Sequence, residues 1–225
     1  MFKRYAIFYT PPVGPFADFC ASWLGWDSRA GKSLEHPTIS GFDVAALTDV
    51  PRKYGFHGTL KAPFRLASGQ SVEDLQATLA VFADANAPVT VPGMTLQHHH
   101  GFLALRPTGE ATALNALVAR IVSDLDHFRA PAGADELARR RKAGLTERQE
   151  HNLMTWGYPY VMADFHFHLT LSGRLDDSAG AAVLAQLEPM LSPLVPSPFV
   201  VDHITLLGQA EDDMFHEIQR YALAG

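Results

Sequence analysis

Three segments of the chain repeat a histidine, one further residue, a threonine and a leucine. The copies lie at residues 57–60 in "YGFHGTLKAPF", 168–171 in "DFHFHLTLSGR" and 203–206 in "DHITLLG". Imidazole titrates at about pH 6.5, so one ring can take up a proton while another donates one. A threonine hydroxyl two residues away can hydrogen-bond the oxygens of a phosphate. The pattern therefore indicates acid–base chemistry on a phosphate ester.

The first two copies have the alternation of a β-strand, in which every second side chain shares a face. The residues that would share the polar face are His57, Thr59 and Lys61 in the first strand, and His166, His168 and Thr170 in the second. The intervening residues are apolar or glycine and would face a core. Two such strands brought together would supply a base, an acid and two phosphate-binding hydroxyls. This set is sufficient for in-line attack on a phosphodiester without a metal.

The elements around these motifs predict an α+β fold. We expect strands over 4–10, 55–64, 165–174, 198–209 and 214–223, and two strands around a turn near Gly101 within 88–107. We expect helices over 15–27, 71–86, 110–128 and 178–191, and at least partial helix over 129–157. The order strand, helix, strand, strand starts at His57 and again at His168, which indicates an internal repeat. An ordinary α+β chain without a repeat is the alternative. The repeat predicts two pseudo-symmetric lobes, each a small, mainly antiparallel sheet packed with helices.

Composition narrows the class of protein. Apolar residues make up 47% of the 225 residues and charged residues 19%, which is typical of a globular chain. No apolar run approaches the length of a membrane span, and the start lacks a signal peptide, so we expect a cytoplasmic protein with no membrane partner. The net charge of −6 argues against binding long nucleic acid. The single cysteine, Cys20, offers neither a disulfide nor a thiolate cluster for zinc. We expect no metal and no cofactor.

"HGTL" at 57–60 and "HLTL" at 168–171 resemble the paired signatures of the two-histidine phosphoesterase superfamily. That group includes RNA 2′,3′-cyclic phosphodiesterases and the so-called 2′-5′ RNA ligases. Longer blocks look like the branch encoded beside carbon–phosphorus lyase genes for phosphonate use. They are "RYAIFYTPP", "WLGWD", "YGFHGTLKAPFRLA", "FLALRP", "FRAP", "ELARRR", "WGYPYV" and "FHFHLTLSGRL". The resemblance spans nearly the whole chain.

This resemblance implies one bilobal domain over residues 1–225, with approximate lobes at 43–110 and at 160–225 plus the N-terminal region. It implies that the active site lies in the cleft between the two lobes. It implies that His57 and His168 are the acid–base pair and that Thr59 and Thr170 bind phosphate. It also suggests a small substrate, a ribose 1,2-cyclic phosphate that carries a 5-phosphate. An RNA end with a 2′,3′-cyclic phosphate is the alternative substrate. A non-catalytic nucleotide-binding module is the alternative class of protein.

Several other residues are weaker candidates. Substrate contacts are predicted for Tyr5, Tyr54, Lys61, Arg129, Tyr158 and His166, each with packing or a solvated surface as the alternative. The third motif at His203 is predicted to be structural or to support the site indirectly, because the first lobe has no counterpart to it. The run 98–100, "HHH", is predicted to be a solvated turn next to Gly101 and not a metal site. The arginines at 139–141 fit a solvated helix face or a contact with a substrate phosphate.

Overall fold

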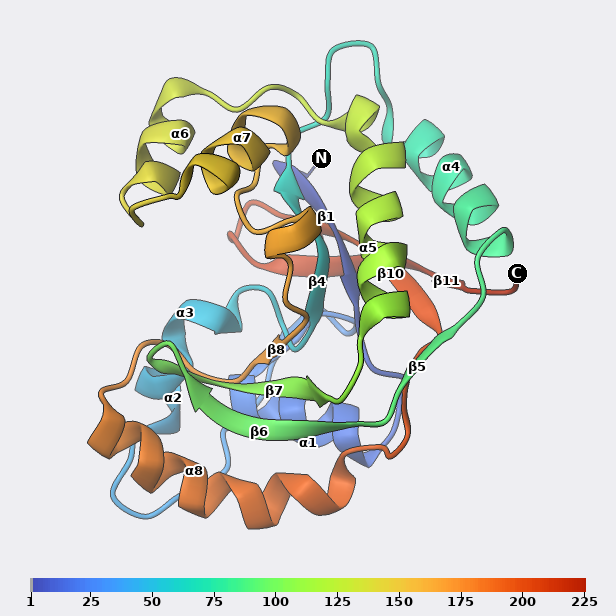
Figure 1. Ribbon diagram of the computed structural model, residues 1–225. Helices are drawn as coiled ribbons and strands as arrows, with labels where there is room; N and C mark the ends of the chain where they lie inside the picture. The colour runs from blue at the N-terminus through green and yellow to red at the C-terminus, as the bar shows by residue number, and fades with distance from the viewer. Residues whose placement is uncertain (1) are drawn as a thin grey trace.

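The computed structural model describes residues 2–225, and its centre is one antiparallel sheet of seven strands (Figure 1). The strands hydrogen-bond in the order β11-β10-β1-β4-β8-β7-β6. Their bounds in this order are Phe215–Ala222, His203–Gln209, Arg4–Tyr9, Gly58–Phe64, Leu169–Thr170, Phe102–Thr108 and Gly93–His99. Two short ladders lie outside the sheet, β2 (Trp26–Asp27) with β3 (Lys32–Ser33) and β5 (Val89–Val91) with β9 (Phe199–Val201). The predicted α+β class is confirmed, but the strands join into one sheet instead of two.

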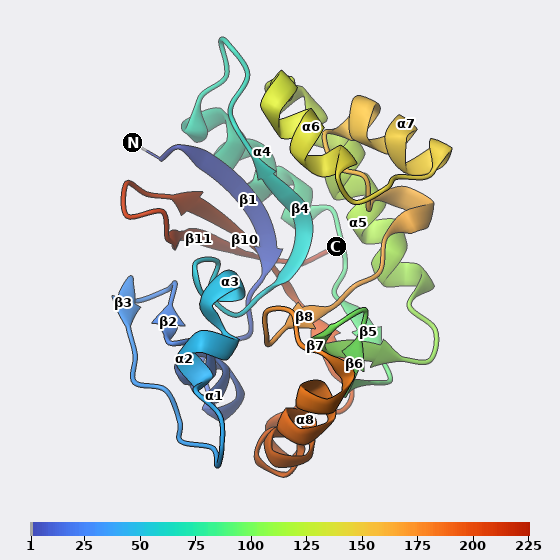
Figure 2. The same cartoon turned by 90° about the vertical axis from the view of Figure 1, so that its left-hand side faces the viewer.

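Helices cover this sheet. They are α1 (Pro15–Leu24), α2 (Val44–Leu47), α3 (Asp49–Arg52), α4 (Val72–Asp84), α5 (Thr112–Asp124), α6 (Ala134–Arg141), α7 (Glu147–Trp156) and α8 (Asp177–Leu191). α4 packs on β10 and β11, α5 packs on β4, and α8 packs on β6 and β7. Figure 2 shows α6 and α7 at the end of the molecule opposite α8. None of the helices within residues 2–225 is long and apolar enough to cross a membrane.

The internal repeat is visible in the order of the elements. β4 is followed by α4, β5, β6 and β7, and β8 is followed by α8, β9, β10 and β11. The strand pairing, however, exchanges the two hairpins. β6–β7 from the first repeat joins β8, whereas β10–β11 from the second reaches β4 through β1. The sheet therefore does not follow the predicted lobes, in which each hairpin stays with its own motif.

β8 is shorter than the strand predicted over 165–174. Only Leu169–Thr170 is a strand, and its ladder with β4 is the single pair Gly58–Leu169. β4 begins at Gly58, so its ladder ends there. On the side of β7, the segment after β8 makes two isolated backbone hydrogen bonds to the β6–β7 hairpin. The Leu171 amide donates to the Leu103 carbonyl (2.8 Å), and the Leu175 amide donates to the Gly101 carbonyl (2.7 Å).

A bulge in β4 changes the face on which Lys61 lies. Phe8 is opposite Thr59 and Ile7 is opposite Lys61, so Leu60 is an extra residue at this point. Lys61 therefore leaves the face of the motif and is only 4% exposed. Its Nζ donates to the Val122 carbonyl (2.9 Å) and pairs with Asp126 (3.1 Å). Burial lowers the pKa of Lys61 to about 8, against the raising effect of Asp126. The prediction that Lys61 shares a face with His57 was wrong.

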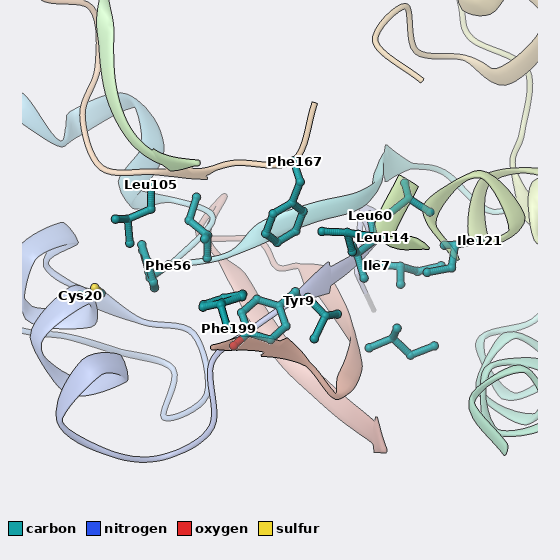
Figure 3. Close-up of a cluster of buried hydrophobic side chains, with 14 of the residues drawn as sticks. Ile7, Tyr9, Cys20, Phe56, Leu60, Leu105, Leu114, Ile121, Phe167 and Phe199 are labelled. Atoms are coloured by element: carbon teal, nitrogen blue, oxygen red, sulfur yellow. The ribbon is translucent and has the colours of Figure 1, made fainter. Parts of the chain in front are cut away.

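The hydrophobic core holds the opposite face of the motif strands. Tyr9, Leu60, Phe167 and Phe199 are buried in one cluster, and the ring of Phe167 points into it (Figure 3). Gly58 lies directly under this ring. A Cβ on Gly58 would come within 2.5 Å of the Phe167 ring atoms, which is far inside van der Waals contact. Glycine is therefore required where the two motif strands meet.

We expect Gly58→Ala to destabilise the fold by about 1–3 kcal/mol, because the added methyl must displace a buried aromatic ring. The measurement is urea unfolding. Gly133→Ala is the matched control, since nothing lies within 4 Å of a Cβ at that position. Equal stability of Gly58→Ala and the wild type would show that Phe167 does not constrain the crossing.

Candidate active site

The two motifs meet at the β4–β8 pair. With Gly58 opposite Leu169 in an antiparallel ladder, the flanking positions place His57 across from Thr170 and Thr59 across from His168. Gly58 and Leu169 are buried, whereas the four motif side chains are half-buried. Two imidazoles and two hydroxyls therefore lie at alternate corners of one small patch of the sheet. The first two copies of the pattern come together as predicted.

The same hydrogen bond orients both imidazoles. Nδ1 of His57 lies 2.8 Å from the Gly55 carbonyl, and Nδ1 of His168 lies 2.8 Å from the His166 carbonyl. In each case the acceptor belongs to the residue two positions earlier. A carbonyl only accepts, so Nδ1 carries the proton and Nε2 is the basic atom of the neutral ring. Nε2 of His57 lies 3.2 Å from the Thr59 hydroxyl.

Burial lowers the pKa of both imidazoles. The pKa of His57 falls to about 4, because burial outweighs the Gly55 carbonyl and the charge of His168 adds to the effect. The ring stacks on Phe8 at 3.9 Å between centroids. Burial also lowers the pKa of His168 against the His166 carbonyl, and the Arg106 guanidinium lowers it further. Both rings are therefore neutral at pH 7 in the free protein.

A cavity of about 860 Å³ opens beside the patch. Thr59 and His168 line the cavity. His57 and Thr170 are the adjacent pair on the same face of the sheet, next to the lining residues. Its other polar and aromatic lining residues are His99, His100, Phe102, Arg106, Gln149, Tyr158, Tyr160, Asp164, Phe165, His166 and Arg174. Volume and lining are suited to a small polar ligand with an anionic group.

The weaker sequence candidates divide into two sets. Tyr158 and His166 line the cavity, and Tyr54 packs against the His57 ring at 5.6 Å. Tyr5 is instead buried in the core, and its ring meets Phe2 at 6.1 Å. Lys61 lies on the core side, as described above, and Arg129 makes two 2.8 Å bonds to Asp126. The structure therefore places Tyr5, Lys61 and Arg129 away from the cavity lining.

The third motif lies two strands from the patch, on β10. Nδ1 of His203 donates to Asp202 at 2.6 Å. Thr205 is fully buried and its hydroxyl is 2.8 Å from that of Thr10. Neither side chain lines the cavity. The third copy thus lies apart from the patch, and the structural or supporting role expected for it stays a prediction.

The histidine run at 98–100 is only in part a solvated turn. His100 and Gly101 have φ angles of 51° and 81° and form the tight turn between β6 and β7. His99 and His100 nevertheless line the cavity, which the sequence reading missed. The side chain of His98 is 14% exposed. Within residues 2–225, no three His, Cys, Asp or Glu side chains are grouped so that they could hold a metal ion.

Two arginines of the basic run contact α7 and the segment after it. Arg140 lies over the Tyr158 ring at 4.8 Å, and Arg141 pairs with Glu150 on α7. The sequence reading missed Arg106 and Arg174 altogether. Arg106 lies in β7 and Arg174 lies shortly after β8. These positions show that the two side chains lie near His168 only when the pairing register of the strands is known.

We expect NMR titration of the free protein to give His57 a pKa of about 4 instead of the ordinary 6.5. The His57 imidazole resonance is assigned as the signal that is missing from the spectrum of the His57→Gln variant. As the pH falls, the imidazole is protonated in the unfolded chain at about pH 6.5, before it is protonated in the folded protein at about pH 4. The free energy of unfolding that His57 contributes is therefore present above pH 6.5 and is lost as the pH falls toward 4. A titration midpoint near 6.5 would contradict the burial of this ring.

Comparison of the amino-acid sequence with known proteins finds one family and two curated relatives. A family described as "Protein of unknown function (DUF1045)" matches residues 59–216. A ribose 1,5-bisphosphate phosphokinase PhnN of Janthinobacterium sp. (strain Marseille) is 32% identical over 231 residues, covering 99% of this chain and 51% of that protein. The protein of the same name from Laribacter hongkongensis (strain HLHK9) is 34% identical over 179 residues, covering 77% and 41%. The chain thus spans about half the length of these curated relatives.

Solved structures also match over the full chain. A phosphoesterase is 16% identical, covers 100% of both chains and has a TM-score of 0.45. LigT of E. coli in the apo form is 13% identical over 99% of this chain and 98% of its own, with a TM-score of 0.44. Likeness at this level does not transfer a function, so the case for one rests on the side-chain geometry. The sequence match, by contrast, is sufficient to assign a family: the chain belongs to the family described as a protein of unknown function, DUF1045.

Proposed function

We propose that the protein is a metal-independent cyclic phosphodiesterase that opens a cyclic phosphate on a small sugar phosphate. One observation carries the proposal. Two imidazoles, each held by the same bond from Nδ1 to the carbonyl two residues earlier, alternate with two threonine hydroxyls on one patch of the sheet beside a cavity. In this proposal the two ends of the sheet act as lobes that flank the substrate.

The chemistry follows from the protonation states. Water attacks phosphorus while Nε2 of His57 takes its proton, because a ring with a pKa of about 4 is neutral at physiological pH. The bond from phosphorus to one ribose oxygen breaks, and Nε2 of His168 donates a proton to that oxygen. The product is a ribose phosphomonoester in which the leaving oxygen has become a new hydroxyl. Thr59 and Thr170 donate hydrogen bonds to the non-bridging oxygens.

The proton on His168 depends on the substrate. In the empty site burial and the Arg106 cation lower the pKa of this ring. A bound phosphate supplies a negative charge beside the imidazole, which raises its pKa and favours the imidazolium. Binding of the correct anion therefore prepares the acid. In this proposal His57, whose pKa burial lowers to about 4, is the base, and His168 is the acid.

A ribose 1,2-cyclic phosphate with a 5-phosphate is the substrate that we favour. The curated relatives are named for ribose 1,5-bisphosphate, a ribose that carries two phosphates. The sequence blocks resemble the phosphonate branch of the two-histidine phosphoesterases. Both point to a small sugar phosphate in place of a long nucleic acid, in keeping with a net charge of −6.

A nucleoside or RNA 2′,3′-cyclic phosphate is the second candidate substrate. The cavity is large, at about 860 Å³, and Tyr158 and Tyr160 lie in its wall with their rings edge to face at 5.6 Å. Such rings can stack on a nucleobase. A non-catalytic binding module, the alternative from another class, would bind these compounds without turnover.

We expect His57→Ala and His168→Ala each to lower turnover of the cyclic phosphate by about 10²–10⁴-fold, because each removes one partner of the proton transfer. Activity is measured beside circular dichroism, which is expected to stay unchanged. His203→Ala is the matched control, a His-x-Thr histidine on β10, two strands away from the patch. If either motif variant kept near-normal turnover, the acid–base assignment would be wrong.

A substrate panel in the presence of EDTA separates the candidates. We expect ribose 1,2-cyclic phosphate 5-phosphate to be opened with a higher kcat/KM than an RNA oligonucleotide that ends in a 2′,3′-cyclic phosphate, and we expect EDTA to have no effect. A preference for the RNA end would favour the second candidate. Tight binding of both without turnover would indicate the binding module, and loss of activity with EDTA would indicate a metal enzyme.

A further inference from the structure

Arg106 extends the catalytic patch by one strand. β7 pairs with β8 through Ala104–Thr170 and Leu105–Leu169, so the next position places Arg106 across from His168. Thr59 lies across from His168 on the other side. Thr59, His168 and Arg106 thus form one row across three adjacent strands, about 5 Å apart from strand to strand. All three line the cavity.

The guanidinium of Arg106 has no protein partner. It makes no hydrogen bond or ion pair within the part of the chain that the structure describes, residues 2–225, although the side chain is half-buried. Arg148, which reaches the cavity wall at Asp164, is by contrast paired with that carboxylate. A half-buried cation without a counter-ion loses solvation free energy that no protein group replaces. The presence of such a cation in the wall of a cavity therefore indicates an anionic ligand.

The charge balance of the cavity leads to the same conclusion. Its lining contains one carboxylate, Asp164, which Arg148 binds through two oxygens at 2.6 and 2.9 Å and Asn152 at 3.1 Å. Arg148 thus neutralises the negative charge in the wall. Arg106 and Arg174 then give the cavity a net positive charge within a chain whose net charge is −6.

We propose that Arg106 binds the reacting phosphate on the side of His168 and stabilises the negative charge on its non-bridging oxygens as the ring opens. This inference rests on the proposed function and adds a residue to it. A guanidinium offers several N–H donors in a planar fork, which matches two oxygens of one phosphate. The two threonine hydroxyls would hold the phosphate at the patch, and Arg106 would supply its counter-charge.

The same position couples Arg106 to the acid. The Arg106 cation opposes protonation of His168 in the free protein. When a phosphate lies between the two side chains, its charge is shared by both, and protonation of His168 becomes favourable. Arg106 therefore links binding of the anion to the protonation state that the reaction needs. A residue with only a packing role would not have this effect.

The test measures binding of inorganic phosphate and the His168 titration in the full-length protein. We expect Arg106→Gln to weaken phosphate binding at least about ten-fold and to lower kcat/KM for the cyclic phosphate about 100-fold. We also expect the pKa of His168 in the free Arg106→Gln variant to rise above its wild-type value, because a neighbouring positive charge is gone. Lys32→Gln, which removes an exposed cation on β3, is expected to match the wild type.

The outcomes distinguish this inference from the function on which it rests. If the wild type opens no cyclic phosphate but phosphate binding and the His168 titration respond to Arg106→Gln, the function fails and the anion site stands. If turnover, phosphate affinity and the His168 pKa all stay within two-fold of the wild type, Arg106 has no such role. Should Arg106→Gln fail to fold, Arg106→Met retains the apolar stem, and Arg106→Lys keeps the charge without the fork. Wild-type phosphate affinity in the folded Arg106→Met variant, which has no charge at this position, would overturn the proposal.

Discussion

The contact of β4 with β8 at Gly58 and Leu169 is the constraint on which the rest of the site depends. It brings together two motifs that lie far apart in the chain and sets them in antiparallel register. Because the register is antiparallel, each histidine faces the threonine of the other motif. The buried Phe167 ring can approach only because residue 58 has no Cβ. One glycine and one aromatic ring thus fix the relative position of the four motif side chains.

The internal repeat explains why this contact creates a symmetric site. Each repeat supplies a motif strand, a helix, a short strand and a hairpin, and the short strands β5 and β9 pair with each other. The exchange of hairpins ties each motif to the other repeat, so neither half completes the sheet alone. The symmetry extends to single atoms, since both Nδ1 atoms bond to the carbonyl of the residue two positions earlier. The repeats differ in their surroundings, and Arg106 lies beside His168 only.

Much of this arrangement could be predicted from the sequence, and the failures have physical causes. The alternation of apolar and polar residues was sufficient to place His57 with Thr59 and His168 with Thr170, because strand faces depend on neighbouring residues only. Lys61 was misplaced by a bulge at Leu60 that local alternation does not reveal. Arg106 was missed because its place depends on the register between β7 and β8, a long-range pairing. His99 and His100 were missed for a related reason, since the path of the hairpin relative to the cavity is set by tertiary packing.

The central claim is that two imidazoles of lowered pKa act as base and acid across one phosphate. The most direct measurement is the pH dependence of kcat/KM and of kcat on the cyclic phosphate. We expect both profiles to be bell-shaped, and the acidic limb of kcat/KM to fall toward the His57 pKa of about 4 in the free protein. The alkaline limb of kcat should lie at higher pH than that of kcat/KM, because bound phosphate raises the pKa of His168. A profile with a single limb, or alkaline limbs that coincide, would contradict the claim.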